Sequence, residues 1–210
     1  MPYYAQSWSH GRYIQIGDVP GWDDAMSDDD RWEFAKRLHN AGASSGVRKG
    51  LYDPQLDPKL APSHYKLTKP KTKRPDVFRA RSGVVLANDA VVSLVERFDP
   101  GRHQIIDTNV TNSRSEPLDG APYRILHVLP VQEALVTDPE QVEKLSSTSD
   151  YYVLRGGRGV VTVREAALDP DIHLWKDPLI PSGWFLSDAL FAALKERGLD
   201  FMAAKKARAA

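Results

Sequence analysis

One pattern occurs twice in this chain and constrains its fold more than any other feature: a short apolar run, a helix-capping residue and an amphipathic stretch. The first copy spans residues 83–101 (GVVLANDAVVSLVERFDPG) and the second spans 183–201 (GWFLSDALFAALKERGLDF). At an offset of about one hundred positions, the predicted cap Asn88 (or Asp89 beside it) aligns with Asp188, another good N-cap residue. The pattern predicts two strand–helix units.

The remaining periodic segments favour short strands. We expect strands near residues 3–16, 103–110, 121–131 and 173–175, and a hairpin over 151–168 with its tip at 155–159. Further helices are expected from Ser27 to about Gly42 and from Pro139 to Leu145, whereas residues 203–210 are expected to fray. Together these elements predict an α+β fold, with a mostly antiparallel sheet and a few packed helices.

Prolines recur between residues 44 and 75, and this segment is predicted to be an exposed connection. We expect an N-terminal subdomain over 1–75 that includes this proline-rich basic connection, an α+β domain over 76–203 and a basic tail over 204–210. Seven positive charges lie between Lys66 and Arg81, against Asp76 alone. A nucleic-acid patch is the alternative interpretation of this basic stretch, and the sequence does not decide its role.

Composition excludes several classes of protein. Lysine and arginine total 28 and are balanced by 28 aspartates and glutamates, whereas a protein that coats nucleic acid or an anionic membrane needs a basic excess. The absence of cysteine excludes disulfides, thiolate zinc sites and cysteine nucleophiles. No apolar stretch reaches the roughly 18 residues that span a bilayer, and residues 1–18 lack the pattern of a secretory signal. We therefore expect a cytoplasmic protein with no membrane partner.

The sequence lacks the motifs that carry well-defined catalytic chemistry. A G-x-S-x-G nucleophile elbow and the glycine-rich phosphate loops are absent, and the glycines of residues 156–159 precede β-branched residues typical of a strand. The histidines are far apart and form no metal-ligand pattern: His10, His39, His64, His103, His127 and His173. We therefore predict no catalytic residue, no metal site and no cofactor, and we expect that the chain is not an enzyme.

Three segments of the second half resemble one protein family. Residues 84–107 look like its strand–helix–strand unit, residues 119–135 like its central strand, and residues 173–201 like its closing strands and final helix. The family is that of bacterial immunity proteins, numbered eleven among the immunity classes of polymorphic toxin systems and formerly described as a domain of unknown function. The likeness covers residues 83–201 and rests on the order and spacing of packing positions and helix caps.

The resemblance implies a protein that binds a cognate secreted antibacterial toxin, often one delivered by a type VI apparatus, and neutralises it by occluding its active site. The toxin is then the partner, and no catalytic residue is carried over from the family. Affinity would come from aromatic anchors ringed by charges. We expect a surface of this kind in the N-terminal segment, formed by Trp8, Trp22, Asp23, Asp24, Asp28, Asp29, Asp30 and Trp32. Core packing is the competing explanation for Trp32, and it is the favoured one for Trp175 and Trp184, which lie in strand patterns. Against a nuclease toxin, these aspartates would mimic phosphates.

Other functions remain open alternatives. An uncharacterised cytoplasmic enzyme would need a deep polar pocket that holds perturbed carboxylates or histidines. A nucleic-acid-binding protein would use Lys66 to Arg81 and the C-terminal tail, and its affinity would fall steeply with salt, although the neutral net charge disfavours this function. A scaffold or interaction protein of the same secretion locus is a third alternative. The sequence predicts neither the toxin's identity nor the oligomeric state.

Overall fold

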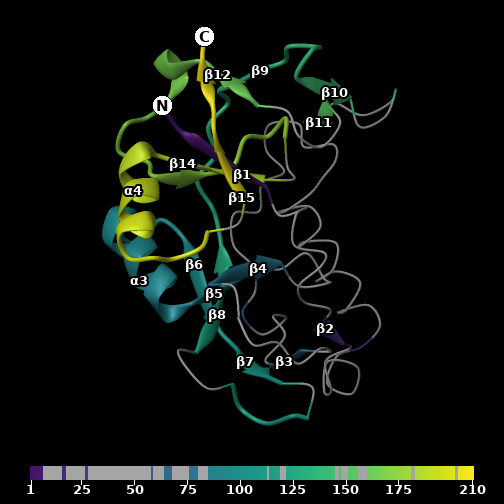
Figure 1. Ribbon diagram of the computed structural model, residues 1–210, viewed down its shortest axis with the longest axis vertical. Coiled ribbons are helices and arrows are strands. Elements are labelled where there is room, and N and C mark those ends of the chain that lie inside the picture. Colours follow the sequence, from purple (N-terminus) through teal and green to yellow (C-terminus); the bar gives the residue numbers. More distant parts are fainter. Residues whose placement is uncertain are drawn as a thin grey trace.

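The computed structural model describes fourteen parts of the chain, and strands predominate in them (Figure 1). These parts are residues 1–6, 16–17, 27, 58, 64–67, 76–79, 85–112, 114–118, 122–144, 147, 151–155, 160–180, 183–201 and 203–210. Two α-helices and several small sheets, mostly of antiparallel strands, form the described part. The predicted α+β class is therefore confirmed.

Both predicted strand–helix units are present. In the first, β5 (Val85–Asn88) leads into α3 (Asp89–Phe98), and in the second, β14 (Gly183–Leu186) leads into α4 (Asp188–Glu196). Each strand is almost fully buried, which explains its continuous apolar run. The two helices pack against each other along one side of the molecule (Figure 1).

The helix caps correct the predicted alignment of the two units by one position. Asn88 caps α3, because its Oδ1 accepts the main-chain N–H of Val91 at 3.0 Å. The cap of α4 is Ser187 rather than Asp188: the Ser187 hydroxyl accepts the N–H of Leu190 at 3.1 Å from an extended backbone. Asp188 is instead the first helical residue, where its negative charge faces the positive end of the helix dipole.

One four-stranded sheet brings the two ends of the chain together. Its order is β13 (Leu174–Trp175), β14, β1 (Tyr3–Gln6) and β15 (Ala203–Lys206), and all neighbours are antiparallel. β1 therefore lies between two strands from the C-terminal part of the chain, across the boundary predicted at residue 75. Most of residues 7–75 lie outside the described parts, so the predicted N-terminal subdomain stays a prediction.

A second four-stranded sheet surrounds the other strand–helix unit. Its order is β4 (Val77–Arg79), β5, β8 (Tyr123–His127) and β6 (Gln104–Asp107), again antiparallel. β7 (Asn109–Thr111), which follows β6 in the chain, pairs in parallel with β3 (His64–Leu67). β3 pairs in turn with β2 (Ile16–Gly17), so the segments at 16–17 and 64–67 dock beside this sheet (Figure 1).

The segment between β8 and β13 departs from two predictions. The described residues 139–144 do not form the helix predicted from Pro139 to Leu145, because the Asp138 carbonyl and carboxylate hold residues 140–142 in a turn. The strand β10 (Val142–Lys144) follows and pairs with β11 (Tyr152–Leu154). The predicted hairpin over 151–168 is also wrong, because β12 (Thr162–Val163) pairs with β9 (Leu135–Val136) rather than with β11. A short 3₁₀ turn, η4 (Glu165–Ala167), follows β12.

The C-terminal residues do not fray. β15 pairs with β1, and β16 (Arg208–Ala209) pairs in parallel with β12. Between them, the N–H of Ala207 donates to the Pro2 carbonyl at 2.9 Å and the N–H of Arg208 donates to Val161 at 2.9 Å. The segment therefore connects the β1 sheet to the β12 sheet. The positive charges of this segment are exposed, and only the small, buried Ala207 lies between them. The segment therefore lacks the alternating large apolar residues from which a strand is predicted.

The core lies on both faces of the sheet that contains β1. On the helix side, Trp184 and Leu186 pack with Leu194 of α4. On the other side, Phe185 packs with Tyr4 and Trp175, with ring centroids 5.0 and 5.6 Å apart respectively. Trp175 and Trp184, expected in the core from their strand patterns, are 2% and 9% exposed. This alternation of side chains along β14 positions α4 over β1.

Candidate functional site

The partner-binding residues predicted from the sequence cannot be placed. Trp8, Trp22, Asp23, Asp24, Asp28, Asp29, Asp30 and Trp32 all lie outside the described residues. Ser27, the expected cap of the helix predicted up to about Gly42, is described and is exposed. In the basic stretch, Lys66 and Arg79 lie in β3 and β4, and the other five positive residues lie outside the described parts.

A different aromatic pair lies at the surface, where α4 crosses β1. The rings of Tyr3 and Phe191 are stacked, with their centroids 3.7 Å apart and their planes 16° from parallel. Both residues are partly buried, and Tyr3 packs against the core on the helix side. Because a strand holds one ring and a helix holds the other, the pair has little freedom to rearrange.

Two lysines flank this aromatic pair. The Lys206 ammonium lies 6.0 Å from the centroid of Tyr3, and the Lys195 ammonium lies 5.5 Å from the centroid of Phe191. At a stacking distance of 3.7 Å there is no room for an ammonium between the rings, so each lysine covers an outer face. The order is Lys206, Tyr3, Phe191, Lys195, and we name these four residues the ring column.

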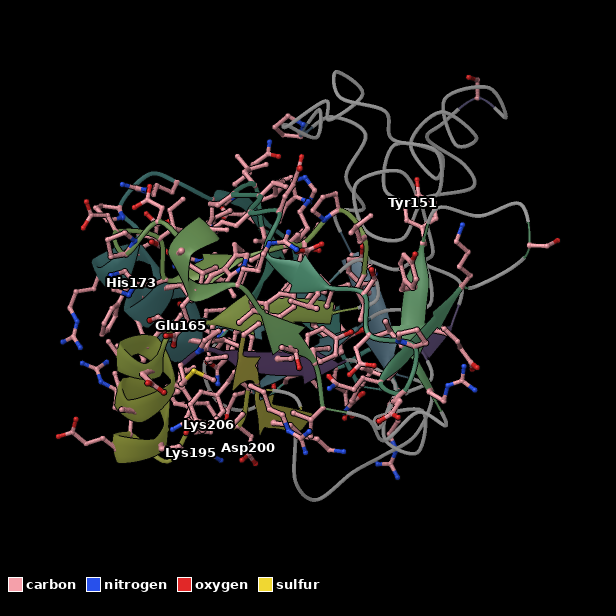
Figure 2. The ribbon with its side chains drawn as sticks, turned by 90° about the horizontal axis from the view of Figure 1, so that it is seen from above. Tyr151, Glu165, His173, Lys195, Asp200 and Lys206 are labelled. Atoms are coloured by element: carbon pink, nitrogen blue, oxygen red, sulfur yellow. The ribbon has the colours of Figure 1, made fainter. Side chains whose placement is uncertain are left out.

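The local structure explains how the ring column forms. Lys206 is directly opposite Tyr3 in the pairing of β1 with β15, and cross-strand neighbours of this kind interact. Lys195 follows Phe191 by four positions in α4, so the two share one helix face. Both lysines are exposed and lie on the same side of the molecule (Figure 2). Each exposed cation–ring contact contributes about 0.5–1 kcal/mol, so the column is held by several weak contacts.

Acidic residues lie at the other end of α4. The Met1 ammonium is 2.8 Å from the Asp188 carboxylate and 3.8 Å from that of Glu165. Asp188 precedes Phe191 by three positions in α4, on the same helix face. The surface of α4 near β1 therefore has an aromatic centre, two lysines and a paired acidic edge, which is the mixed composition of a protein-binding surface.

Two buried carboxylates, Asp99 and Asp177, share the burial of many catalytic groups, but their hydrogen bonds show structural roles. Asp99, at the end of α3, accepts the main-chain N–H of His173 at 2.9 Å and that of Leu174 at 2.8 Å. Burial raises the pKa of Asp99, but hydrogen bonds from the His103 ring and from these two amides outweigh it and hold the pKa below its ordinary value. The ionised carboxylate anchors the start of β13.

Asp177 has the matching role at β9. Its Oδ2 accepts the N–H groups of Ala134 and Leu135, both at 2.8 Å, and its Oδ1 accepts that of Leu179 at 2.9 Å. Burial raises the pKa of Asp177 despite these bonds. The preceding residue, Lys176, is 7% exposed, and burial lowers the pKa of its ammonium to about 8. These two adjacent buried ionisable groups therefore lie where β13 meets the start of β9.

One pair of residues has the composition of a nucleophile and its base. The Oγ of Ser187 and the Nδ1 of His173 are 2.8 Å apart. The Ser187 hydroxyl, however, is occupied as the cap of α4, and Asp99 binds the main chain of His173 rather than its ring. A catalytic triad needs the carboxylate on the imidazole, where it sets the tautomer. We therefore interpret this contact as a link between β13 and α4.

Within the part of the chain that the structure describes, no three His, Asp or Glu side chains are placed to hold a metal ion. No helix in that part is long and apolar enough to cross a membrane. No protein-family model matches the chain, and no curated protein matches its sequence. The resemblance to the immunity family is thus a prediction that these comparisons leave untested.

Sequence reasoning missed the ring column for a physical reason. Tyr3 reads as part of an aromatic strand, and Phe191 and Lys195 read as a helix face, so each local signal is visible in the sequence. The pairing of β1 with β14 and β15 unites them, and that pairing joins opposite ends of the chain. The spacing of Phe191 and Lys195 is the one local signal that points to a cation–ring contact.

Proposed function

We propose that this chain is an immunity protein, which binds a cognate secreted antibacterial toxin in the cytoplasm of the producing cell and neutralises it by occluding the active site. The toxin would belong to a polymorphic or type VI system and would be encoded beside the chain. The ring column is the observation that carries the proposal. The resemblance over residues 83–201 supports it from the sequence.

The ring column has the properties of a binding anchor. Interfaces concentrate their binding energy in a few aromatic and basic side chains that are surrounded by polar groups. Tyr3 and Phe191 are held in place by β1 and α4, so binding costs little further side-chain entropy. The flanking lysines and the acidic edge at Asp188 and Glu165 supply charges that orient a partner and speed its association.

The N-terminal tryptophans and aspartates named above remain part of this proposal as a second contact region. Their acidic character would suit a toxin with a basic active site, such as a nuclease, because carboxylates can occupy positions that phosphates would take. Charge reversal at Asp28, Asp29 and Asp30 should then weaken toxin binding. Unchanged affinity for the purified toxin would remove this region from the proposal.

A co-expression experiment tests the proposed function. The secreted protein encoded next to the chain is produced in a susceptible bacterium with and without the chain, and survival is measured together with complex formation by size-exclusion chromatography. We expect protection and a stoichiometric complex. Killing that persists at equal expression, with no complex, would contradict the proposal.

A variant pair connects that experiment to the ring column. Phe191→Asp places a carboxylate in the aromatic centre, whereas Ala192→Asp places one at the adjacent exposed position of the same helix. We expect the first variant to lose most of its affinity for the toxin and the second to keep it. Equal affinities for the two folded variants would exclude the ring column as the anchor.

A further inference from the structure

The exposed chemistry of the ring column identifies the kind of surface that it fits. We propose that the ring column recognises carboxylates on an acidic protein surface. This inference rests on the proposed function in one respect: it takes the toxin to be the protein that carries the acidic surface. It concerns the charge of the partner's contact region, which the proposed function does not specify.

The arrangement of the four side chains determines which of their groups are available. The inner faces of Tyr3 and Phe191 cover each other, and their outer faces lie beneath the ammonium groups of Lys206 and Lys195. No ring face in the column is therefore open to an incoming flat group. The groups left for a partner are the two ammonium ions and the edges of the two rings.

These available groups all favour anions. Each lysine ammonium offers N–H donors and no acceptor. The edge of an aromatic ring carries the positive part of its quadrupole, so the ring edges also attract negative atoms. Lys195 and Lys206 lie at opposite ends of the column, so two separate carboxylates can each approach one ammonium while the ring edges contact the groups between them.

The same arrangement disfavours single-stranded nucleic acid as the occupant. Proteins that bind single strands stack bases on open aromatic faces, and here the lysines and the rings themselves occupy those faces. Binding through phosphates alone needs a broad basic surface, whereas this chain has zero net charge.

A binding experiment with two defined probes tests the inference. Fluorescence anisotropy is measured with a labelled polyglutamate peptide and with a labelled oligothymidylate of equal charge, using the full chain. The test variant is Lys195→Glu/Lys206→Glu, in which both charges of the column are reversed. The control is Lys205→Glu, which reverses an exposed charge. Lys205 is next to Lys206 in β15, so its side chain projects from the opposite face of the sheet.

Since basic residues elsewhere also attract the peptide, the decisive quantity is the difference between the variants. We expect the double reversal to weaken peptide binding by about tenfold or more and Lys205→Glu to weaken it by less than about twofold, with circular dichroism showing all three proteins folded. Equal weakening by the two variants, or no measurable peptide binding to the parent chain, would overturn the inference. The inference would also be overturned if the oligothymidylate bound more tightly than the peptide and the double reversal abolished that binding.

The co-expression experiment separates this inference from the proposed function. If the parent chain protects cells and the double reversal protects equally well, the acidic-surface inference fails while the immunity function stands. If the parent chain binds polyglutamate through the ring column but does not protect cells, the immunity function fails and the inferred charge preference stands.

Discussion

The carboxylate of Asp99 accepts the main-chain N–H of Leu174 at 2.8 Å, although the two residues are 75 positions apart in the chain. Asp99 ends the first strand–helix unit, and Leu174 begins the strand beside the second. A buried ionised group that accepts main-chain N–H groups is stabilising only while those donors are in place. The bond therefore makes the packing of one unit depend on the position of the other.

Replacing Asp99 should be among the most damaging substitutions in the described part of the chain. Asp99→Ala leaves the N–H groups of His173 and Leu174 buried without their acceptor and removes the partner of the His103 ring. We expect the free energy of unfolding to fall by about 3–5 kcal/mol, measured by urea denaturation. Asp107→Ala, at an aspartate whose side chain is 97% exposed, should change it by less than about 0.5 kcal/mol. Similar values for the two variants would contradict the anchoring role.

Lys176 should make stability depend on pH in the alkaline range. Its pKa is about 8 in the folded chain, against an ordinary value of 10.5. Below pH 8 both states hold the proton, and the cost of burying the charge is fully present. Between pH 8 and 10.5 the unfolded state retains a proton that the folded state releases, so the free energy of unfolding should rise with pH, by about 3 kcal/mol in total.

The variant Lys176→Met isolates this effect. The parent should show the alkaline rise, whereas the variant, which lacks the titrating group and keeps an apolar chain of similar length, should show none. Urea denaturation of parent and variant at pH 7, 8, 9 and 10 measures both profiles. A parent profile that is flat or falls over this range would contradict the lowered pKa.

Gly183 is required by the close approach of β14 to β1. A Cβ at this position would lie 2.5 Å from a ring carbon of Tyr4 and 2.6 Å from the carbonyl oxygen of Ala5. The carbonyl belongs to the paired main chain and cannot move without opening the sheet. We therefore expect Gly183→Ala to destabilise the chain by about 1–3 kcal/mol. Gly101→Asn is the matched control, because the space there is open and asparagine tolerates the positive φ of 66°.

Substitutions at Ser187 and Asp188 test which of the two residues caps α4. Ser187→Ala removes the bond to the N–H of Leu190 and should cost about 1 kcal/mol, whereas Ser187→Thr should keep most of it. Asp188→Ala should cost less than Ser187→Ala, since Asp188 follows the cap and acts through charge alone. Thermal unfolding of the three variants measures the order. A greater loss from Asp188→Ala would restore the alignment predicted from the sequence.

Local signals in the sequence were sufficient to predict the α+β class and the two strand–helix units. Val85 to Phe98 and Gly183 to Glu196 carry apolar spacing and caps that act within one segment, and the structure forms them there. The helix predicted from Pro139 failed because Asp138 closes a turn and Val142 pairs with Leu154. There, a tertiary contact outweighed a weak local preference.

For a related reason, neither the pairing of the strands nor the candidate site could be predicted from the sequence. The strand nearest to β12 in the chain is β11, with which it would form a hairpin. β12 instead pairs with β9 and with β16, and no residue near Thr162 predicts either pairing. The ring column likewise depends on Tyr3 lying opposite Lys206. Pairings between distant segments are set by how the whole core packs, and a single sequence does not display that.

The position of β1 has a consequence for the order in which the ribosome produces this fold. β1 emerges first, but its two partners, β14 and β15, are among the last strands to be synthesised. This four-stranded sheet therefore cannot be completed until residue 206 has left the ribosome. A nascent chain arrested before residue 183 would carry β1 with both edges unpaired, and unpaired strand edges are sites of aggregation that chaperones protect.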